Sequence, residues 1–302
     1  MDKLCIEYQR KFLDNLIYDH SVFANIDPCV KLHREVNNHP LSSAASCLNV
    51  IGSLASNPSQ LRDFLNMFGL NVDEIYEFPY GANVGGRTYK DKGYAIFEWI
   101  GPQDSPINEK GGGRGYNRTS IDAFIIAKID GRITQVLIEW KYTEGKSSPL
   151  ALGKFSGYRG LERLRRYSSV LHQWRNTDLF PFNFKDEGGI GLYDFSVDHL
   201  YQLLRITLLA KTTIDINIGH LKIEDYRIVH LSHSLNNETK ALRKEHLKFS
   251  PGLQQYLDEK LYDVWKNVLS TREKNKFIGG YWDSNLHEIK DDMLRDYLTK
   301  RY

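Results

Sequence analysis

The first seventy residues carry apolar positions at helical spacing. Between residues 2 and 24 apolar side chains recur every three or four positions, which predicts an amphipathic helix. A second helix is predicted after Ser42 or Ser43, either of which can cap its first turn. A third, from Pro58 to about Met67, follows closely. The chain is therefore expected to begin with helices.

From about residue 74 the pattern becomes that of strands. Residues 74–80 and 93–100 are rich in β-branched and aromatic side chains. After a loop rich in Gly and Pro, residues 120–144 contain two strand-like runs on either side of Asp130-Gly131, a dipeptide typical of tight hairpin turns. The sequence therefore predicts a β-hairpin within this part of the chain.

Helical and strand patterns alternate again after the hairpin. Helices are predicted at 158–175 and 196–211, a strand at 226–233, and charged helices from 236 onward. The order helix, three strands, helix, strand indicates an α/β domain. We expect three parts: an N-terminal helical arm (1–40), an α/β core (41–235) and a C-terminal helical subdomain (236–302).

The composition is that of a globular protein with its own core. Of 302 residues 41% are hydrophobic and 26% charged, and the net charge is only +2, so any affinity for nucleic acid must come from local patches. Cys5, Cys29 and Cys47 form neither a disulfide framework nor a zinc-binding pattern. With no signal peptide or long apolar run, the sequence favours a cytoplasmic protein.

The hairpin brings three charged residues together. In a two-residue loop centred on Asp130-Gly131, residue 129 opposes residue 132, and counting outward places Asp122 opposite Glu139. Opposed residues share a face of the sheet. Lys141, two residues beyond Glu139, lies on that same face. Two carboxylates and an ammonium group are therefore expected side by side.

The flanking residues of both strands are apolar on both faces, which is typical of strands buried on both sides. Like charges directly across a strand pair are destabilising, and buried charges are costly without partners. A hard cation such as Mg²⁺ would relieve this, because it prefers oxygen ligands and keeps waters that phosphate oxygens can replace. The alternative is a plain salt bridge on a polar outer face.

Asp122 followed by Glu139-x-Lys141 on adjacent strands resembles the PD-(D/E)xK nuclease superfamily, whose core is a helix, three strands, a helix and a fourth strand. Further segments between about 40 and 235 are similar to a bacterial restriction endonuclease-like group, and LIEWKYTE is the most specific of them. These segments are SSAASCLNVIG (42–52), YAIFEW (94–99), RTSIDAF (118–124), LIEWKYTE (137–144) and LYQLLRITLLA (200–210).

The resemblance implies a restriction-endonuclease-like fold, with a three-stranded antiparallel meander, and a Mg²⁺-dependent deoxyribonuclease in which Mn²⁺ can substitute. Asp122 and Glu139 would bind the metal, and Lys141 would orient the attacking water or stabilise charge on the phosphate. The superfamily often adds an earlier acidic residue, for which Glu98 is the best match. Gln202 matches a helical Gln that supports the Lys or the water in some members.

Two positions depart from the pattern of the family. Ile121 precedes Asp122, where the Pro of the superfamily name would stand. Ala44 follows the paired serines 42 and 43, where a Gln is expected. The second departure puts any role of that helix in doubt.

The segment 154–175 is basic and also carries aromatic residues. Such a helix just after the hairpin favours contact with a nucleic-acid backbone, although charge runs are more commonly solvated surfaces. The candidate contacts are Arg159, Arg163, Arg165, Arg166 and Arg175, together with Lys154, against the single acidic Glu162.

Several alternatives remain open at the level of sequence. The favoured function is restriction or phage defence, with DNA as partner and a homodimer cutting both strands. The others are a repair, recombination or branched-DNA nuclease, a catalytically idle nucleic-acid-binding protein, and nucleotide binding at residues 145–147, which lack the spacing of a P-loop. His230 and His233 lie three apart on a predicted strand, so they face opposite sides and are poor co-ligands.

Overall fold

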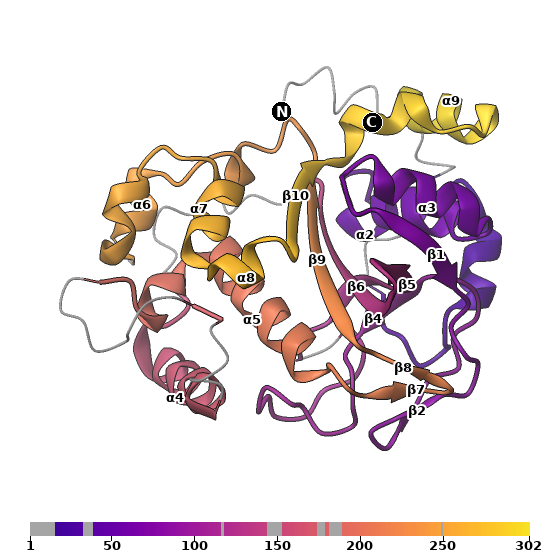
Figure 1. The fold of residues 1–302 in the computed structure, drawn as a ribbon. Coiled ribbons are helices and arrows are strands. Elements are labelled where there is room, and N and C mark those ends of the chain that lie inside the picture. The colour runs from indigo at the N-terminus through magenta and orange to yellow at the C-terminus, as the bar shows by residue number, and fades with distance from the viewer. Residues whose placement is uncertain are drawn as a thin grey trace.

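A mixed β-sheet forms the centre of the molecule in the computed structural model (Figure 1). The structure describes residues 16–32, 39–115, 118–143, 153–173, 179–180, 189–248 and 250–302. The sheet follows the order β1-β5-β6-β9-β10, with β4 also paired to β5. Its strands are β1 (Val72–Tyr76), β4 (Ile96–Trp99), β5 (Ile121–Ile129), β6 (Arg132–Lys141), β9 (Asp225–Ser232) and β10 (Phe277–Tyr281).

Strand β4 pairs antiparallel with β5, and β5 pairs antiparallel with β6. Strand β9 is parallel to β6, and β10 is parallel to β9. A parallel pair needs a long crossover, and here the chain between β6 and β9 contains helices α4 (Gly157–Gln173) and α5 (Asp198–Thr212). Strands β1 and β4 share one edge of β5, each pairing with a different half of it. This α/β arrangement is compatible with a restriction endonuclease-like fold.

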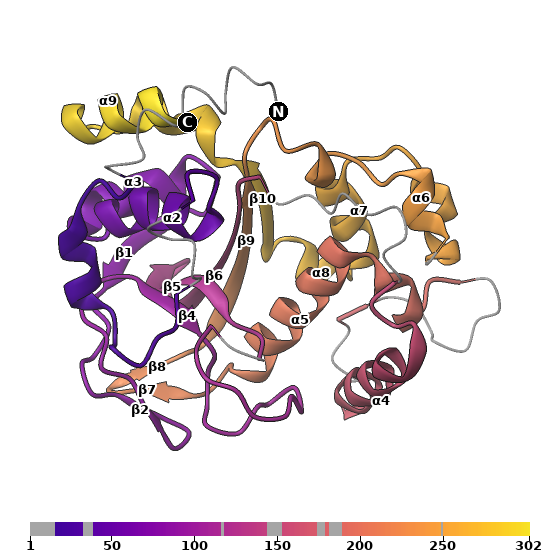
Figure 2. The ribbon, with the colours of Figure 1, turned by 180° about the vertical axis from the view of Figure 1, so that it is seen from behind.

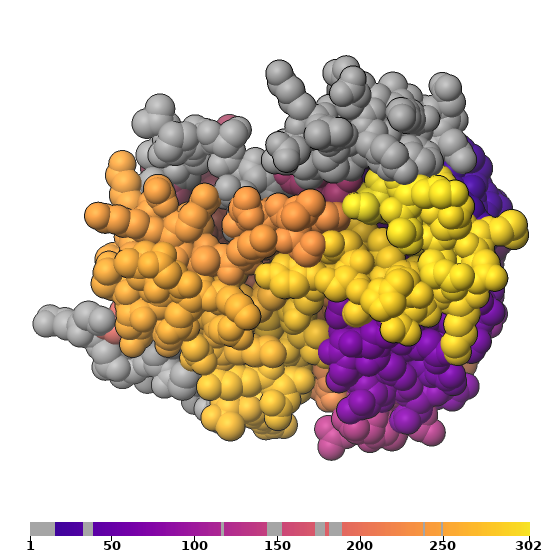
Figure 3. All heavy atoms as spheres, turned by 90° about the horizontal axis from the view of Figure 1, so that it is seen from above, coloured from indigo at the N-terminus to yellow at the C-terminus, as the bar shows by residue number. Residues whose placement is uncertain are grey.

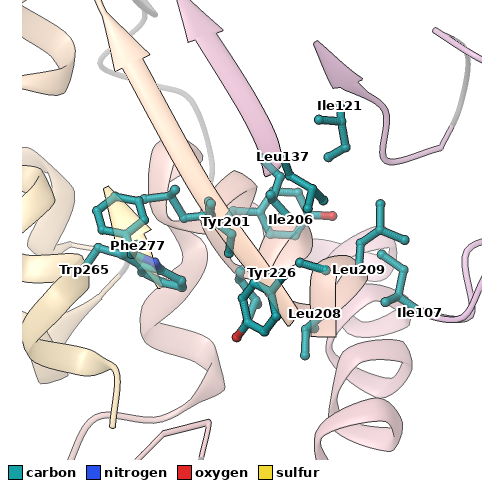
Figure 4. Close-up of a cluster of buried hydrophobic side chains, with 14 of the residues drawn as sticks. Ile107, Ile121, Leu137, Tyr201, Ile206, Leu208, Leu209, Tyr226, Trp265 and Phe277 are labelled. Atoms are coloured by element: carbon teal, nitrogen blue, oxygen red, sulfur yellow. The ribbon is translucent and has the colours of Figure 1, made fainter. Parts of the chain in front are cut away.

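Helices cover both faces of the sheet (Figures 1 and 2). One face packs against α5 and α7 (Leu261–Val268), with α4 joining the same core from beyond α5. The core on the other face includes α2 (Ser43–Cys47), α3 (Pro58–Asn66) and α9 (Asp292–Arg301). Figure 4 shows the first of these cores, where Leu137 of β6 and Tyr226 of β9 meet Ile206 and Leu209 of α5. The central strands are thus buried on both sides, as their apolar sequences predict.

Short elements connect this framework. They are η1 (His20–Asn25), η2 (Leu48–Gly52), β2 (Asn83–Val84), β3 (Arg87–Thr88), η3 (Leu192–Ser196), β7 (Asn217–Ile218), β8 (Leu221–Lys222), η4 (Asn237–Thr239), α6 (Lys244–Leu247), η5 (Pro251–Tyr256), α8 (Thr271–Lys274) and η6 (Trp282–Glu288).

Most of the predicted elements are confirmed. Ser42 caps α2 through its hydroxyl, which accepts from the Ala45 amide at 3.2 Å. Helix α3 begins at Pro58, and the hairpin turns at Asp130-Gly131, where both residues have positive φ values. The helices expected at 158–175 and 196–211 correspond to α4 and α5, and the last predicted strand to β9.

Two predictions at the chain ends need correction. The segment after residue 235 is not only helical, because it contributes β10 to the central sheet. Figure 3 shows that the C-terminal residues, in yellow, lie against an early part of the chain, in indigo and purple. For the predicted helix at 2–24, residues 1–15 lie outside the described part, and 20–25 form the 3-10 helix η1. The domain boundaries at 40 and 235 stay predictions.

Candidate active site

The hairpin has the register that its turn predicts. The ladder pairs Ile129 with Arg132 and continues to Ala123 opposite Ile138, so the next positions outward are Asp122 and Glu139. The backbone amide of Trp140, next to Glu139, donates to Asp122 Oδ2 at 2.7 Å. The two acidic residues therefore lie level with each other on neighbouring strands.

Both carboxylates and the lysine face α5. On β6, the Gln135 amide donates to the carbonyl of Ala210 in α5 at 2.7 Å, so Glu139 and Lys141, four and six residues later, point to the same side. On β5, Phe124 belongs to the core on that side, and Asp122 precedes it by two residues. The positions of the neighbouring residues agree with the shared face that the sequence predicts.

Lys141 and Glu139 form a buried ion pair. Lys141 Nζ lies 2.6 Å from Glu139 Oε1, and their side chains are only 7% and 6% exposed. An ion pair this far from water needs close, charge-assisted geometry to offset the desolvation of both groups. The single ammonium group of this pair compensates the charge of Asp122 only in part.

Asp122, which is half-buried, is the carboxyl group of the site whose pKa is raised. Burial, followed by the negative charge of Glu139, raises the pKa of Asp122 well above its ordinary value, and Lys141 only partly opposes this rise. Glu98 adds a further negative contribution. The folded protein therefore holds more negative charge here than its own cation neutralises, which is the condition a bound divalent cation would relieve.

A local distortion of β4 is centred on Glu98. The pairs Phe97–Ala123 and Trp99–Ile121 flank it, so Glu98 lies level with Asp122. Its φ of 54° is left-handed, an uncommon and strained conformation for a residue other than glycine. Because of this bend, Trp99 returns to the α5 side of the sheet and stacks on Phe124, with ring centroids 4.3 Å apart.

The donor set fits a hard cation, although it is not preassembled around one. Within the described ranges, no three acidic, histidine or cysteine side chains are grouped as a metal cage. The ammonium group of Lys141 occupies one carboxylate oxygen of Glu139. Carboxylates are the ligand type by which Mg²⁺ is usually held in phosphate chemistry.

The backbone of Lys141 is held by groups distant in sequence. Its carbonyl accepts from Trp282 Nε1 at 3.0 Å and from the His233 amide at 3.0 Å. On the other face of β6, Trp140 Nε1 donates to Ser46 Oγ at 2.8 Å, and the Tyr142 amide donates to Ser43 Oγ. The helix placed in doubt by Ala44 thus supports the end of β6.

This support was not predicted from the sequence. Trp282 lies 141 residues after Lys141, and no local pattern links the two. The paired serines 42 and 43 are the one sequence signal near this contact, and their pattern by itself indicates only a helix cap.

Gln202 lies on the side of α5 that faces the sheet. Helix α5 runs opposite to β6, since Ala210 meets Gln135 and Ile206 packs near Leu137 (Figure 4). One turn before Ile206, Gln202 is therefore directed towards the Glu139 end of the strand. It is half-buried, which is consistent with a place at the edge of the site.

The basic residues of α4 divide into two groups. Arg159 and Arg165 are exposed. Arg163 donates to the Lys154 carbonyl at 2.8 Å, and Arg166 lies over the Tyr167 ring, with 5.9 Å from Cζ to the centroid, so both have partners within the fold. Arg175 lies outside the described residues, as do 145–147.

A comparison with known protein families shows the family to which the chain belongs. The sequence model of the family described as "Restriction Endonuclease associating with ARP" matches residues 13–302. The chain belongs to this family. The match takes in β10 and α9 as well as the hairpin, so the restriction endonuclease family includes the C-terminal segment. No curated protein and no solved structure gives a significant match.

Membership in a restriction endonuclease family indicates a nuclease role. In the part of the chain that the structure describes, no helix has the length and apolar character to cross a bilayer. Cys29 is exposed and Cys47 is buried, and both are free thiols.

Proposed function

We propose that this protein is a metal-dependent endonuclease that hydrolyses DNA phosphodiester bonds in restriction or phage defence. The observation that carries the proposal is the place of Asp122 at the end of the hairpin ladder, where it accepts from the amide next to Glu139, together with the ion pair of Glu139 and Lys141. Burial and the neighbouring charge of Glu139 raise the pKa of Asp122, which supports a cation as a further partner of this carboxylate. Membership in the restriction endonuclease family supports the reaction class.

Each residue has a distinct role in this proposal. Asp122 and Glu139 would bind Mg²⁺ or Mn²⁺, and Glu98, level with Asp122, would join them or hold a second ion. When bound, the cation supplies Lewis-acid polarisation of the phosphate and lowers the pKa of a coordinated water. Lys141 orients the attacking water and stabilises negative charge on the phosphate through its ammonium group. Gln202 supports Lys141 or the water from α5.

Incubation of the protein with supercoiled plasmid and linear duplex tests the proposal. Cleavage is expected with Mg²⁺ and with Mn²⁺, and none with EDTA. A panel of nicked, branched and single-stranded DNA in the same experiment separates restriction from repair-type activity. Undiminished cleavage in EDTA, or no cleavage of any nucleic acid with either metal, would contradict the proposed function. Cutting of both duplex strands would favour a homodimer as the active form.

We further propose that exposed Arg159 and Arg165 of α4 contact the DNA backbone. Their double replacement by alanine is expected to weaken binding by a similar factor on all sequences, and to lower the salt dependence of log K by about 2, because each lost phosphate contact removes about one released counterion. Fluorescence anisotropy over a salt series measures both effects.

Lys222→Ala provides the matched control. Lys222 is an exposed lysine on the short hairpin β7–β8, with a side-chain exposure of 61%. An unchanged salt slope in the double arginine variant, or an equal loss in the control, would place the DNA elsewhere.

A further inference from the structure

A buried histidine lies beside the candidate catalytic pair. His230 on β9 is the register partner of Glu139 on β6, and its side chain is 0% exposed. It is four residues after Tyr226, which belongs to the core facing α5, so His230 shares the face of Glu139 and Lys141. The positive charge of Lys141 contributes, after burial, to lowering the pKa of His230 well below its ordinary value. Both Lys141 and His199 of α5 are therefore within electrostatic reach of the ring.

The partners of Nδ1 favour one tautomer of the ring. The Tyr262 hydroxyl of α7 lies 2.8 Å from Ser232 Oγ, to which it donates in the assigned network. In that arrangement the tyrosine oxygen, 3.1 Å from His230 Nδ1, accepts there, and the tautomer it favours carries its proton on Nδ1. His230 Nε2 is then an unprotonated acceptor.

This acceptor is buried and unused. Among the described residues, His230 Nε2 has no hydrogen-bond partner. A buried acceptor without a partner costs free energy, so its retention here calls for a reason.

Tyr262 lies on the β10 side of His230. Gly279 of β10 pairs with His230, and a Cβ on Gly279 would lie 2.3 Å from Tyr262 Cγ, so the tyrosine ring packs directly on the glycine. Nδ1, which meets the Tyr262 hydroxyl, is therefore engaged with this tyrosine. On the other side of β9 lies β6, the strand that carries Glu139 and Lys141.

We propose that His230 is a positioning residue for Lys141: its Nε2 lone pair accepts an ammonium hydrogen of Lys141 whenever Glu139 is engaged elsewhere. The lysine then keeps a fixed place beside the carboxylates, instead of turning to solvent, when its ion pair with Glu139 is weakened. Tyr262 holds the tautomer that makes this possible. The inference rests on the proposed function for its catalytic meaning, but the contact itself can be tested without DNA or metal.

The contact is tested by ¹⁵N NMR of the histidine rings in metal-free protein. Glu139→Gln removes the charge that holds Lys141, so the His230 Nε2 resonance is expected to move from the position of a free acceptor towards that of a hydrogen-bonded one. Adding Lys141→Met in the same background should reverse the movement. If the resonance does not move in Glu139→Gln, or moves equally with Lys141→Met present, the contact is refuted.

The catalytic meaning is tested by a matched pair of variants. His230→Gln keeps an acceptor near the Nε2 position, and His230→Leu fills similar volume without one. With both folds verified by thermal melting, Leu is expected to lower kcat about 10- to 100-fold, the usual effect of losing a partner that orients an active-site ligand, with DNA affinity unchanged. Gln is expected to restore most of kcat.

The possible outcomes separate the two proposals. Equal kcat in both variants, high or low, would overturn the positioning role while leaving the nuclease function intact. An inactive wild-type protein would count against the proposed function and leave the NMR test standing.

Discussion

Replacing Asp122 with asparagine is expected to abolish cleavage and, at the same time, to stabilise the metal-free protein. The substitution removes the charge that binds a cation, so the rate should fall by on the order of 10³-fold, equivalent to about 4 kcal/mol in the barrier. The new amide oxygen can still accept from the Trp140 N–H, which keeps the local hydrogen bond. Repulsion from Glu139 and Glu98 disappears, which should stabilise the fold by on the order of 1 kcal/mol, or roughly 2–4 °C in Tm.

The stability gain should depend on pH in a defined direction. The pKa of Asp122 is raised in the folded protein, so wild type is favoured below the ordinary carboxyl pKa and loses that stability as pH rises through the raised value. Asparagine cannot ionise, so the difference in Tm between variant and wild type should grow with pH.

The exposed Asp130 at the tip of the same hairpin supplies the control for this experiment. Its side chain is 71% exposed. Asp130→Asn should therefore leave cleavage unchanged and alter stability by less than about 0.5 kcal/mol. Thermal melts in EDTA and plasmid cleavage in Mg²⁺ measure the two effects. An Asp122→Asn protein that still cuts, or one that becomes less stable relative to wild type as pH rises, contradicts the proposed electrostatics of the site.

Replacing Lys141 with methionine is expected to lower both activity and metal-free stability. Glu139 would remain buried with no cation, and breaking such a pair from one side typically costs about 3–5 kcal/mol. Loss of a charged group beside the reacting phosphate should reduce cleavage by about 10²–10³-fold. Mg²⁺ should raise the Tm of the variant more than that of wild type, because the carboxylates no longer share their charge with an ammonium group.

Lys128→Met, on strand β5 of the same hairpin, tests whether any lysine there has these effects. Lys128 is half-buried and lies opposite Ile133, away from the carboxylates. The Lys128→Met protein should retain full activity, and its Tm should respond to Mg²⁺ as that of wild type does. If Lys141→Met loses activity but responds to Mg²⁺ just as wild type does, the lysine and the cation do not share the carboxylates.

The central hairpin was predictable because its information is local. Asp130-Gly131 sets the turn, the turn sets the register, and the register places Asp122 level with Glu139. The period of two along a strand then adds Lys141. Nothing distant was needed to predict this part of the site.

The rest depends on contacts between segments far apart in the chain. Strand β10 is hidden in the sequence because two glycines interrupt the strand-forming residues of FIGGY. The parallel pairing with β9 and the packing of Tyr262 on Gly279 define it. The left-handed bend at Glu98 was equally hidden, since nothing in the sequence marks a glutamate for positive φ.

Titration of Mn²⁺, followed by electron paramagnetic resonance in wild type and Asp122→Asn, shows whether Asp122 and Glu139 jointly bind a divalent cation, on which the proposed chemistry depends. Wild type should bind Mn²⁺ stoichiometrically and release it to excess Mg²⁺, whereas Asp122→Asn should lose this binding while remaining folded. Equal Mn²⁺ binding by both proteins, or none by wild type, would show that these two carboxylates do not form a cation site.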